Sequence, residues 1–420
     1  MVPTMKLPAF SLLLAVSSAL AAPADIQQWR GPNRDGLFPS TGLLKQWPQE
    51  GPALAWKLAG LGRGMASVSV AGGKIYTTGG RKGGQFIVAF DAASQKELWA
   101  ARLCDKGGEP RCTPTVDGAF VYALSSEGDL VCVSAADGKE IWRKSFATDF
   151  GDPKKPNWQF SESPFVDGDK LVVVPGSAEA MVVALDKKTG NIIWKTAAEL
   201  PGKGHVGAGY TGVVVSNAAG IRQYVTLVGK GAIGVDAKNG KLLWHYNRVA
   251  NGTAVIPTPL VWDDYVFVSS GYGTGAALLK IVKGTGDSPV TAEEQYFLNA
   301  STFQNHHGGM VRIGDYIYAG KGHNNGFPIC LEWKTGKVAW EKERGPGTAS
   351  AAVIAADGNL YFRYEDGTMA LIEASPVGYS EKGAFKLATL NGKSWPHPVI
   401  HDGKLYIRDQ DALLCYSVAK

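Results

Sequence analysis

The sequence has little excess charge of either sign and no long apolar run. Its 43 Lys and Arg residues against 38 Asp and Glu leave a formal net charge of +5 over 420 residues. The basic residues are interspersed and form no cluster suited to nucleic acid, so we expect no nucleic-acid partner. No apolar run reaches the length that crosses a bilayer, so we expect a protein that is not embedded in a membrane.

The N-terminus has the pattern of a secretory signal peptide. Lys6 supplies a weak positive charge, an apolar stretch covers residues 7–16, and Ala19-Leu20-Ala21 offers a cleavage site of small residues. We assign residues 1–21 to a signal peptide cleaved near Ala21 and expect a periplasmic or secreted protein. No Cys adjoins the cleavage site, so no lipid anchor is predicted.

Cysteine is scarce, and its count of five is odd for an oxidising compartment. Cys104 and Cys112 flank a short loop and are a candidate disulfide, which would contribute roughly 2–3 kcal/mol. Cys132, Cys330 and Cys415 fall in one equivalent position of a repeat, where other copies have Ala or Gly. We therefore interpret these three as small buried core residues.

A nine-residue cassette that recurs along the chain organises the sequence. An acidic residue or Ser opens it, Gly follows four residues later and Trp closes it. The copies are Asp91–Trp99, Ser134–Trp142, Asp186–Trp194, Asp236–Trp244 and Glu332–Trp340. Gly fills its position in four copies, and Gln95 departs from it. An Asp can accept hydrogen bonds from N–H groups two residues on, and Gly supplies a positive φ, so each cassette predicts a tight antiparallel hairpin.

The cassettes belong to eight repeats of antiparallel strands, a pattern typical of a propeller. The repeats open near residues 67, 113, 163, 212, 257, 308, 349 and 396. The eighth has three strands, and residues 54–58 (around Trp56) resemble a closing strand without predecessors. We predict an all-β, eight-bladed β-propeller of four-stranded antiparallel blades, whose ring is closed by the N-terminal strand near Trp56.

The predicted organisation has two parts after the signal peptide. Residues 52–420 form the propeller, and residues 22–51 form an arm packed on it, with Trp29 and Trp47 buried at its edge. The fifth repeat carries an insert at residues 283–294, for which we expect a surface loop.

The cassettes, the exported chain and the eight blades resemble the pyrroloquinoline-quinone (PQQ)-like propeller repeat, over about residues 52–418. That family includes quinoprotein alcohol dehydrogenases and a non-catalytic outer-membrane assembly lipoprotein. Its catalytic members use a bound quinone, a calcium ion and a vicinal Cys–Cys disulfide. This sequence has no adjacent Cys pair and no Cys-x-x-Cys-His heme motif.

Candidate site residues lie just upstream of the first strand of each blade, because those loops crowd one mouth of the central channel. The ligand-binding candidates are Arg63, Trp158, Glu162, His205, Asn305, His306, His307, Trp395 and His397. Neighbouring His residues on a strand point to opposite faces, and we assign no metal site. Trp158 and Trp395 lie outside the cassettes and are candidates for stacking on a ligand.

Three functions remain open on these observations. The favoured one is a non-catalytic exported scaffold that binds a small molecule or an envelope protein at the channel mouth, as a monomer. The second, which the resemblance implies, is a PQQ-dependent dehydrogenase of alcohols or sugars with calcium as a further cofactor. The third is a hydrolase-like or metal-binding propeller that uses the His cluster.

Overall fold

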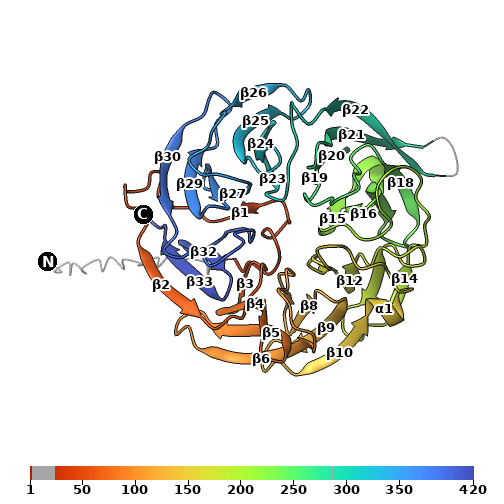
Figure 1. The fold of residues 1–420 in the computed structure, drawn as a ribbon, viewed down its shortest axis with the longest axis horizontal. Coiled ribbons are helices and arrows are strands. Elements are labelled where there is room, and N and C mark those ends of the chain that lie inside the picture. The colour runs from red at the N-terminus through yellow and green to blue at the C-terminus, as the bar shows by residue number, and fades with distance from the viewer. Residues whose placement is uncertain (2–23, 285–287) are drawn as a thin grey trace.

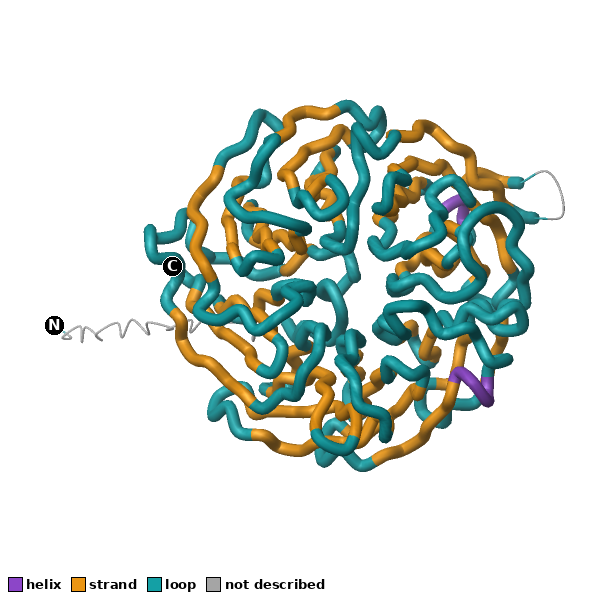
Figure 2. The backbone as a smooth tube through the Cα atoms, in the orientation of Figure 1, coloured by secondary structure: helices purple, strands orange, loops and turns teal. Residues whose placement is uncertain are grey.

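The computed structural model describes residues 1, 24–284 and 288–420, and shows a ring of β-sheets around a central axis (Figure 1; Figure 2). Apart from Met1, the predicted signal peptide lies outside the described residues. Helical structure in the described part is confined to α1 (Phe146–Asp149) and a 3-10 turn (Ala218–Gly220). No helix among these residues has the length and apolar character needed to cross a bilayer.

The described strands form eight antiparallel four-stranded blades, which confirms the predicted fold class. Blades one and two comprise β3 (Ser69–Ala71), β4 (Lys74–Arg81), β5 (Gly84–Asp91), β6 (Glu97–Cys104), β7 (Thr115–Asp117), β8 (Phe120–Leu124), β9 (Asp129–Ser134) and β10 (Glu140–Ser145). Blades three and four comprise β11 (Phe165–Asp167), β12 (Lys170–Val173), β13 (Val183–Asp186), β14 (Ile192–Lys195), β15 (Val214–Ser216), β16 (Gln223–Val228), β17 (Gly231–Asp236) and β18 (Leu242–Tyr246).

The second half of the ring repeats this arrangement. Blades five and six comprise β19 (Leu260–Trp262), β20 (Tyr265–Ser270), β21 (Gly275–Lys283), β22 (Val290–Leu298), β23 (Met310–Ile313), β24 (Tyr316–Lys321), β25 (Phe327–Glu332) and β26 (Val338–Glu341). Blades seven and eight comprise β27 (Ala351–Ala356), β28 (Asn359–Tyr364), β29 (Thr368–Glu373), β30 (Glu381–Lys386), β31 (Val399–His401), β32 (Lys404–Asp409), β33 (Ala412–Ser417) and the N-terminal β2 (Leu54–Ala59).

Blade eight joins the two ends of the propeller, as the three-strand eighth repeat predicts. Strand β2 pairs antiparallel with β33, and Trp56 lies opposite Cys415. Its place at the rim, outside β33, is visible in Figure 1. Because this pairing covers the free edge of β33, the sheet order closes the ring.

The cassettes form the last hairpin of five blades and pack against a neighbouring blade. Asp186 accepts hydrogen bonds from the backbone N–H of Lys188 and Thr189, as the turn chemistry predicts. Gly190 has a φ of 72°, and a Cβ there would lie 2.8 Å from the indole of Trp142 in the preceding blade. The Gly position therefore meets two needs, a left-handed backbone and close packing on the neighbouring Trp. Gln95, which replaces Gly in the first cassette, adopts the same left-handed backbone, with φ of 58°.

Blade seven has no cassette Trp, and the arm fills the space. Gly383 is the partner of Leu371 beside the bulge of β29 and β30, and a Cβ on Gly383 would lie 2.8 Å from Cβ of Trp47. The Trp47 ring packs 5.8 Å from Tyr361, much as Trp99 packs 5.9 Å from Tyr76 in blade one. Trp47 is thus buried against blade seven, and it continues the series of Trp–Tyr contacts around the ring.

The arm then crosses the centre of the ring, so the expectation that Trp29 lies at the edge was wrong. Strand β1 (Leu37–Phe38) pairs with the innermost strand β27, and Ile26 bridges to Val70 in blade one. Figure 1 shows this segment at the middle of the ring. Trp29 packs 4.5 Å from His397 of blade eight, because the arm follows the innermost strands and not the outer rim.

Two buried arginines fix the arm to two different blades, four and six. Arg30 donates to the backbone oxygen of Met310 at 2.5 Å, and Arg34 donates to that of Val213 at 3.0 Å. Both side chains are at most 3% exposed. A buried guanidinium is stable only when its N–H groups find acceptors, so these contacts fix the course of the arm.

Two further expectations differ from the structure. The described part of the insert of blade five, residues 283–284 and 288–294, is largely strand, because β21 and β22 extend as a hairpin in which Lys283 pairs with Val290. The disulfide predicted between Cys104 and Cys112 is not formed, and both are buried free thiols. Cys112 instead accepts the backbone N–H of Leu124 at 3.2 Å, because its side chain points into the hydrophobic core and not along the loop.

Candidate functional site

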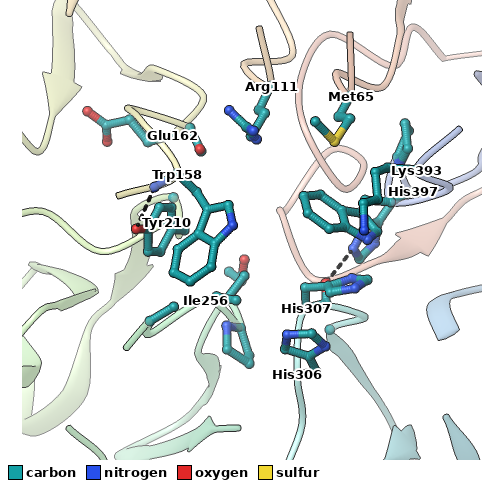
Figure 3. Close-up of a pocket in the computed structure, with 18 of the residues that line it drawn as sticks. Met65, Arg111, Trp158, Glu162, Tyr210, Ile256, His306, His307, Lys393 and His397 are labelled. Carbon is teal, nitrogen blue, oxygen red and sulfur yellow. Dashed lines mark hydrogen bonds between the residues drawn. The ribbon is translucent and has the colours of Figure 1, made fainter. Parts of the chain in front are cut away.

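A cavity of about 540 Å³ occupies the axis of the propeller, at the mouth formed by the loops that precede the innermost strands. Trp29 and Arg30 of the arm line it together with residues from every blade. Figure 3 shows Trp158 and Tyr210 on one wall, facing His306 and His307 across the gap. This volume falls within the usual range for pockets that enclose a small organic molecule.

Six of the nine predicted site residues line this cavity. They are Trp158, Glu162, His306, His307, Trp395 and His397. They precede the first strands of three separate blades, three, six and eight, so the fold brings residues that are distant in the sequence to one place. Their proposed roles in ligand binding stay predictions.

The other three predicted residues lie elsewhere. Arg63 is largely exposed, forms a 3.0 Å ion pair with Glu109 and does not line the cavity. His205 lines a second, smaller cavity beside Val228. Asn305 is fully buried, and its amide donates to the oxygens of Gly309 and Gly320. Asn305 therefore shapes the loop that carries His306 and His307.

The two adjacent histidines lie in that loop, before β23 begins, so the alternation of side chains along a strand does not separate them. Their ring centroids are 4.5 Å apart, and the ring of His323 lies 4.2 Å from that of His306. Ser350 hydroxyl lies 2.8 Å from Nδ1 of His306, and the Tyr272 hydroxyl lies 3.1 Å from Nε2. Burial, together with the two neighbouring imidazoles, lowers the pKa of His306 to about 3, so its ring is neutral.

Glu365 connects the histidines to a tryptophan. Its carboxylate lies 2.9 Å from Nε2 of His307 and accepts a 3.1 Å hydrogen bond from the indole N–H of Trp395. Burial raises the pKa of Glu365, but the hydrogen bonds from His307 and Trp395 more than offset it, and the pKa falls to about 2. Glu365 is therefore an anion over the physiological range.

The arm orients the loop that carries His307, and it does so through His397. Arg30 can only donate, so Nδ1 of His397 is the acceptor of the 3.1 Å contact, and Nε2 carries the hydrogen. Nε2 then donates to the backbone oxygen of His307 at 3.2 Å. Burial and the charge of Arg30 hold the pKa of His397 well below its usual value, which keeps this arrangement in one protonation state.

The opposite wall is aromatic, and the loops before β11 and β15 build it with Trp158 and Tyr210. The backbone N–H of Trp158 donates to the Tyr210 hydroxyl at 3.2 Å, and the two rings meet edge to face at 6.0 Å. Trp158 remains 36% exposed, so its indole is open to a molecule in the cavity. On the other side, Lys393 lies over the ring of Trp395 at 5.3 Å.

Glu162 is the buried acid of the cavity. One carboxylate oxygen accepts the N–H of Val174 at 2.6 Å, and the other has no hydrogen-bond partner among the described residues. Burial raises its pKa to about 8, although the Val174 N–H and the charge of Arg34 act in the other direction.

Sequence reasoning missed Tyr272, His323 and Glu365. They follow β20, β24 and β28, the second strands of blades five, six and seven. In an antiparallel blade the chain returns after its second strand to the end from which the first strand began. The loops after the second strands therefore reach the same mouth as those before the first strands, and this alternation could have identified the three residues.

The sequence matches a known protein family over more than half of its length. A model of the family described as outer membrane protein assembly factor BamB matches residues 83–342. The chain belongs to this family of PQQ-like repeat propellers. The resemblance seen in the cassettes is thereby confirmed.

Individual relatives are distant. The chain is 25% identical over 272 residues to the outer membrane protein assembly factor BamB of Shewanella oneidensis, a match that covers 61% of this chain and 64% of that protein. The match thus spans less than two thirds of that curated relative. The crystal structure of BamB from Moraxella catarrhalis superimposes with a TM-score of 0.61 at 14% identity, covering 87% of this chain and 99% of that one.

A quinone enzyme shares the fold as well. Quinohemoprotein alcohol dehydrogenase from Comamonas testosteroni superimposes with a TM-score of 0.62 at 13% identity, covering 94% of this chain and 80% of that one. At this level of identity the likeness concerns the fold alone. Chemistry has to be assessed from the cavity itself.

The cavity residues do not fit a quinone with calcium. Calcium requires six to eight oxygen ligands, several of them carboxylates converging on one point. Among the described residues the carboxylates that line the cavity are Glu109, Glu162 and Glu365, and each has a different partner: Arg63, the Val174 N–H and His307.

Proposed function

We propose that this chain is an exported, periplasmic propeller that binds a small molecule in its central cavity and acts as a scaffold without redox chemistry. The observation that carries the proposal is the cavity of about 540 Å³ with facing aromatic and imidazole walls. Pockets for organic molecules typically combine apolar walls with a few convergent polar groups. The class that fits is a cyclic molecule that stacks on Trp158 and presents an oxygen to the histidine side.

The test is a panel of sugars, uronic acids and aromatic carboxylates, screened by thermal shift and by Trp fluorescence. We expect a member of the panel to bind to the wild type, and Trp158→Ala to weaken this binding about fivefold or more, since stacking on an aromatic ring contributes about 1 kcal/mol or more. Trp262→Ala is the matched control, because Trp262 is 51% exposed and lies outside the cavity lining. Binding that persists unchanged in Trp158→Ala, or a panel without any binder, would contradict the proposal.

A second candidate function is the docking of an envelope protein. It is favoured by the relatives in this family, which are named outer membrane protein assembly factors. Crosslinking of the purified chain to an envelope extract, followed by mass spectrometry, tests it. A partner crosslinked equally to wild type and Trp158→Ala would place protein docking outside the cavity.

A further inference from the structure

Three imidazoles and a carboxylate crowd one side of the cavity. His306, His307 and Glu365 each present a potential ligand atom, and these atoms all lie within 4.8 Å of one another. The His307 and Glu365 side chains are only 10% and 19% exposed. Nδ1 of His307 and Nδ1 of His323 are buried and have no hydrogen-bond partner among the described residues. Unpaired polar atoms in a buried group are costly, so their presence here suggests a missing ligand.

We propose that His306, His307 and Glu365 form a binding site for a divalent transition-metal ion at the wall of the cavity. This site is independent of the small molecule proposed above and differs from the calcium site of quinone enzymes. It also departs from the sequence-based expectation of no metal, which rested on two histidines pointing apart along a strand. The loop before β23 brings them to the same side.

The donor set selects the class of ion. Imidazole nitrogens suit Zn²⁺, Ni²⁺, Cu²⁺ and Fe²⁺, whereas Ca²⁺ and Mg²⁺ prefer shells of oxygen. Zinc ligands lie about 2.0–2.2 Å from the ion, so neighbouring donor atoms of a tetrahedral site lie roughly 3.3–3.6 Å apart. The donor atoms of His306, His307 and Glu365 lie within 4.8 Å of one another, and those of His307 and Glu365 are 2.9 Å apart, so small side-chain rotations bring the three to that spacing. His323, with its ring 4.2 Å from that of His306, lies beside these three ligands.

The surrounding contacts are those that orient metal ligands in proteins. Ser350 and Tyr272 hold the two nitrogens of His306, so binding at either nitrogen leaves one hydroxyl to fix the ring. The indole of Trp395 holds the second oxygen of Glu365. His397 holds the backbone of His307. Such partners fix the direction of each ligand atom and raise metal affinity.

Three protein ligands on the wall of a cavity leave a coordination position that a molecule in the cavity can occupy. His306, His307, His323 and Glu365 all line the cavity. An oxygen of a bound molecule can therefore enter the metal's shell, an arrangement typical of metal sites that keep an open position.

The experiment uses tag-free protein cleared of metal by a chelator and titrated with Co²⁺ and Zn²⁺. Calorimetry should give one ion per chain, and Co²⁺ should produce the visible d–d absorption of a nitrogen- and oxygen-bound ion. Glu365→Gln, which keeps the size of the side chain, and His307→Ala should each weaken binding about 100-fold. Trp395→Phe, which removes only the supporting N–H, should weaken it about tenfold.

His245→Ala is the matched control, since His245 contacts the backbone of Lys230 outside the cavity. Its affinity for Co²⁺ should equal that of the wild type. Near-UV circular dichroism checks that each variant is folded, and Glu365→Gln decides the matter if His307→Ala does not fold. The proposal is overturned if folded wild type binds no ion saturably, if Glu365→Gln binds as tightly as wild type, or if His245→Ala loses affinity to the same extent. Failure of the small-molecule panel would leave this result unaffected.

Discussion

Replacing residues 54–59 by a Gly-Ser segment of equal length should lower the melting temperature by about 10 °C or more. The replacement removes the β2 ladder with β33 and the packing of Trp56 and Leu58 on the hydrophobic cluster of blades one, seven and eight. Each lost hydrogen bond costs roughly 1 kcal/mol, and the lost apolar burial adds several more. Equal length keeps the arm connected to blade one, so the experiment isolates the closing strand.

Scanning calorimetry measures the effect, and size-exclusion chromatography should show association, because the uncovered edge of β33 can pair with another chain. Lys57→Ser is the control, since Lys57 is exposed on the same strand and its replacement should leave stability nearly unchanged. A Gly-Ser variant that melts with the wild type would contradict closure of the ring by β2.

The second large effect is a loss of stability as the pH rises, caused by Glu162. Its pKa of about 8 in the folded protein lies above the value of 4.5 for a free side chain. Below pH 4.5 both folded and unfolded chains bind the proton. Between pH 4.5 and 8 only the folded chain keeps it, so this residue reduces the free energy of unfolding by about 1.4 kcal/mol per pH unit. The loss levels off above pH 8.

Glu162→Gln should remove this dependence. Gln can still accept the N–H of Val174 and never ionises, so the variant should match wild type near pH 4.5 and exceed it by a few kcal/mol at pH 9. Urea unfolding at pH 5, 7 and 9 gives the difference. Glu109→Gln, at a more exposed carboxyl paired with Arg63, should change stability by less than about 1 kcal/mol. If the free energies of unfolding of wild type and Glu162→Gln changed with pH in parallel, Glu162 would be ionised in the folded protein and the prediction would be wrong.

Much of the fold could be predicted because the cassette acts locally. The turn at Asp186, the left-handed Gly190 and the closing strand at Trp56 depend on residues a few positions apart or on a missing strand in a repeat. The arm could not be placed in this way. Its course depends on where buried arginines find backbone oxygens, such as Met310 and Val213, which are far away in the sequence.

In the candidate site, too, some residues could be predicted from the repeats and others depend on tertiary contacts. The search upstream of each first strand found His306, His307 and Trp395, which line the cavity. It also selected Arg63, which does not line the cavity and forms an exposed ion pair with Glu109. It missed Glu365 because only the three-dimensional return of the second strand brings that carboxylate beside His307. Side-chain direction in loops depends on tertiary contacts that a single sequence does not display.

The central claim is that the cavity binds a small molecule without quinone chemistry. Titration of the purified protein with PQQ and calcium, followed by absorbance spectra and dye-coupled oxidation of alcohols and sugars, tests it most directly. We predict no stoichiometric quinone complex and no dye reduction above the buffer rate. One quinone bound per chain, with turnover of an alcohol or sugar, would contradict the account.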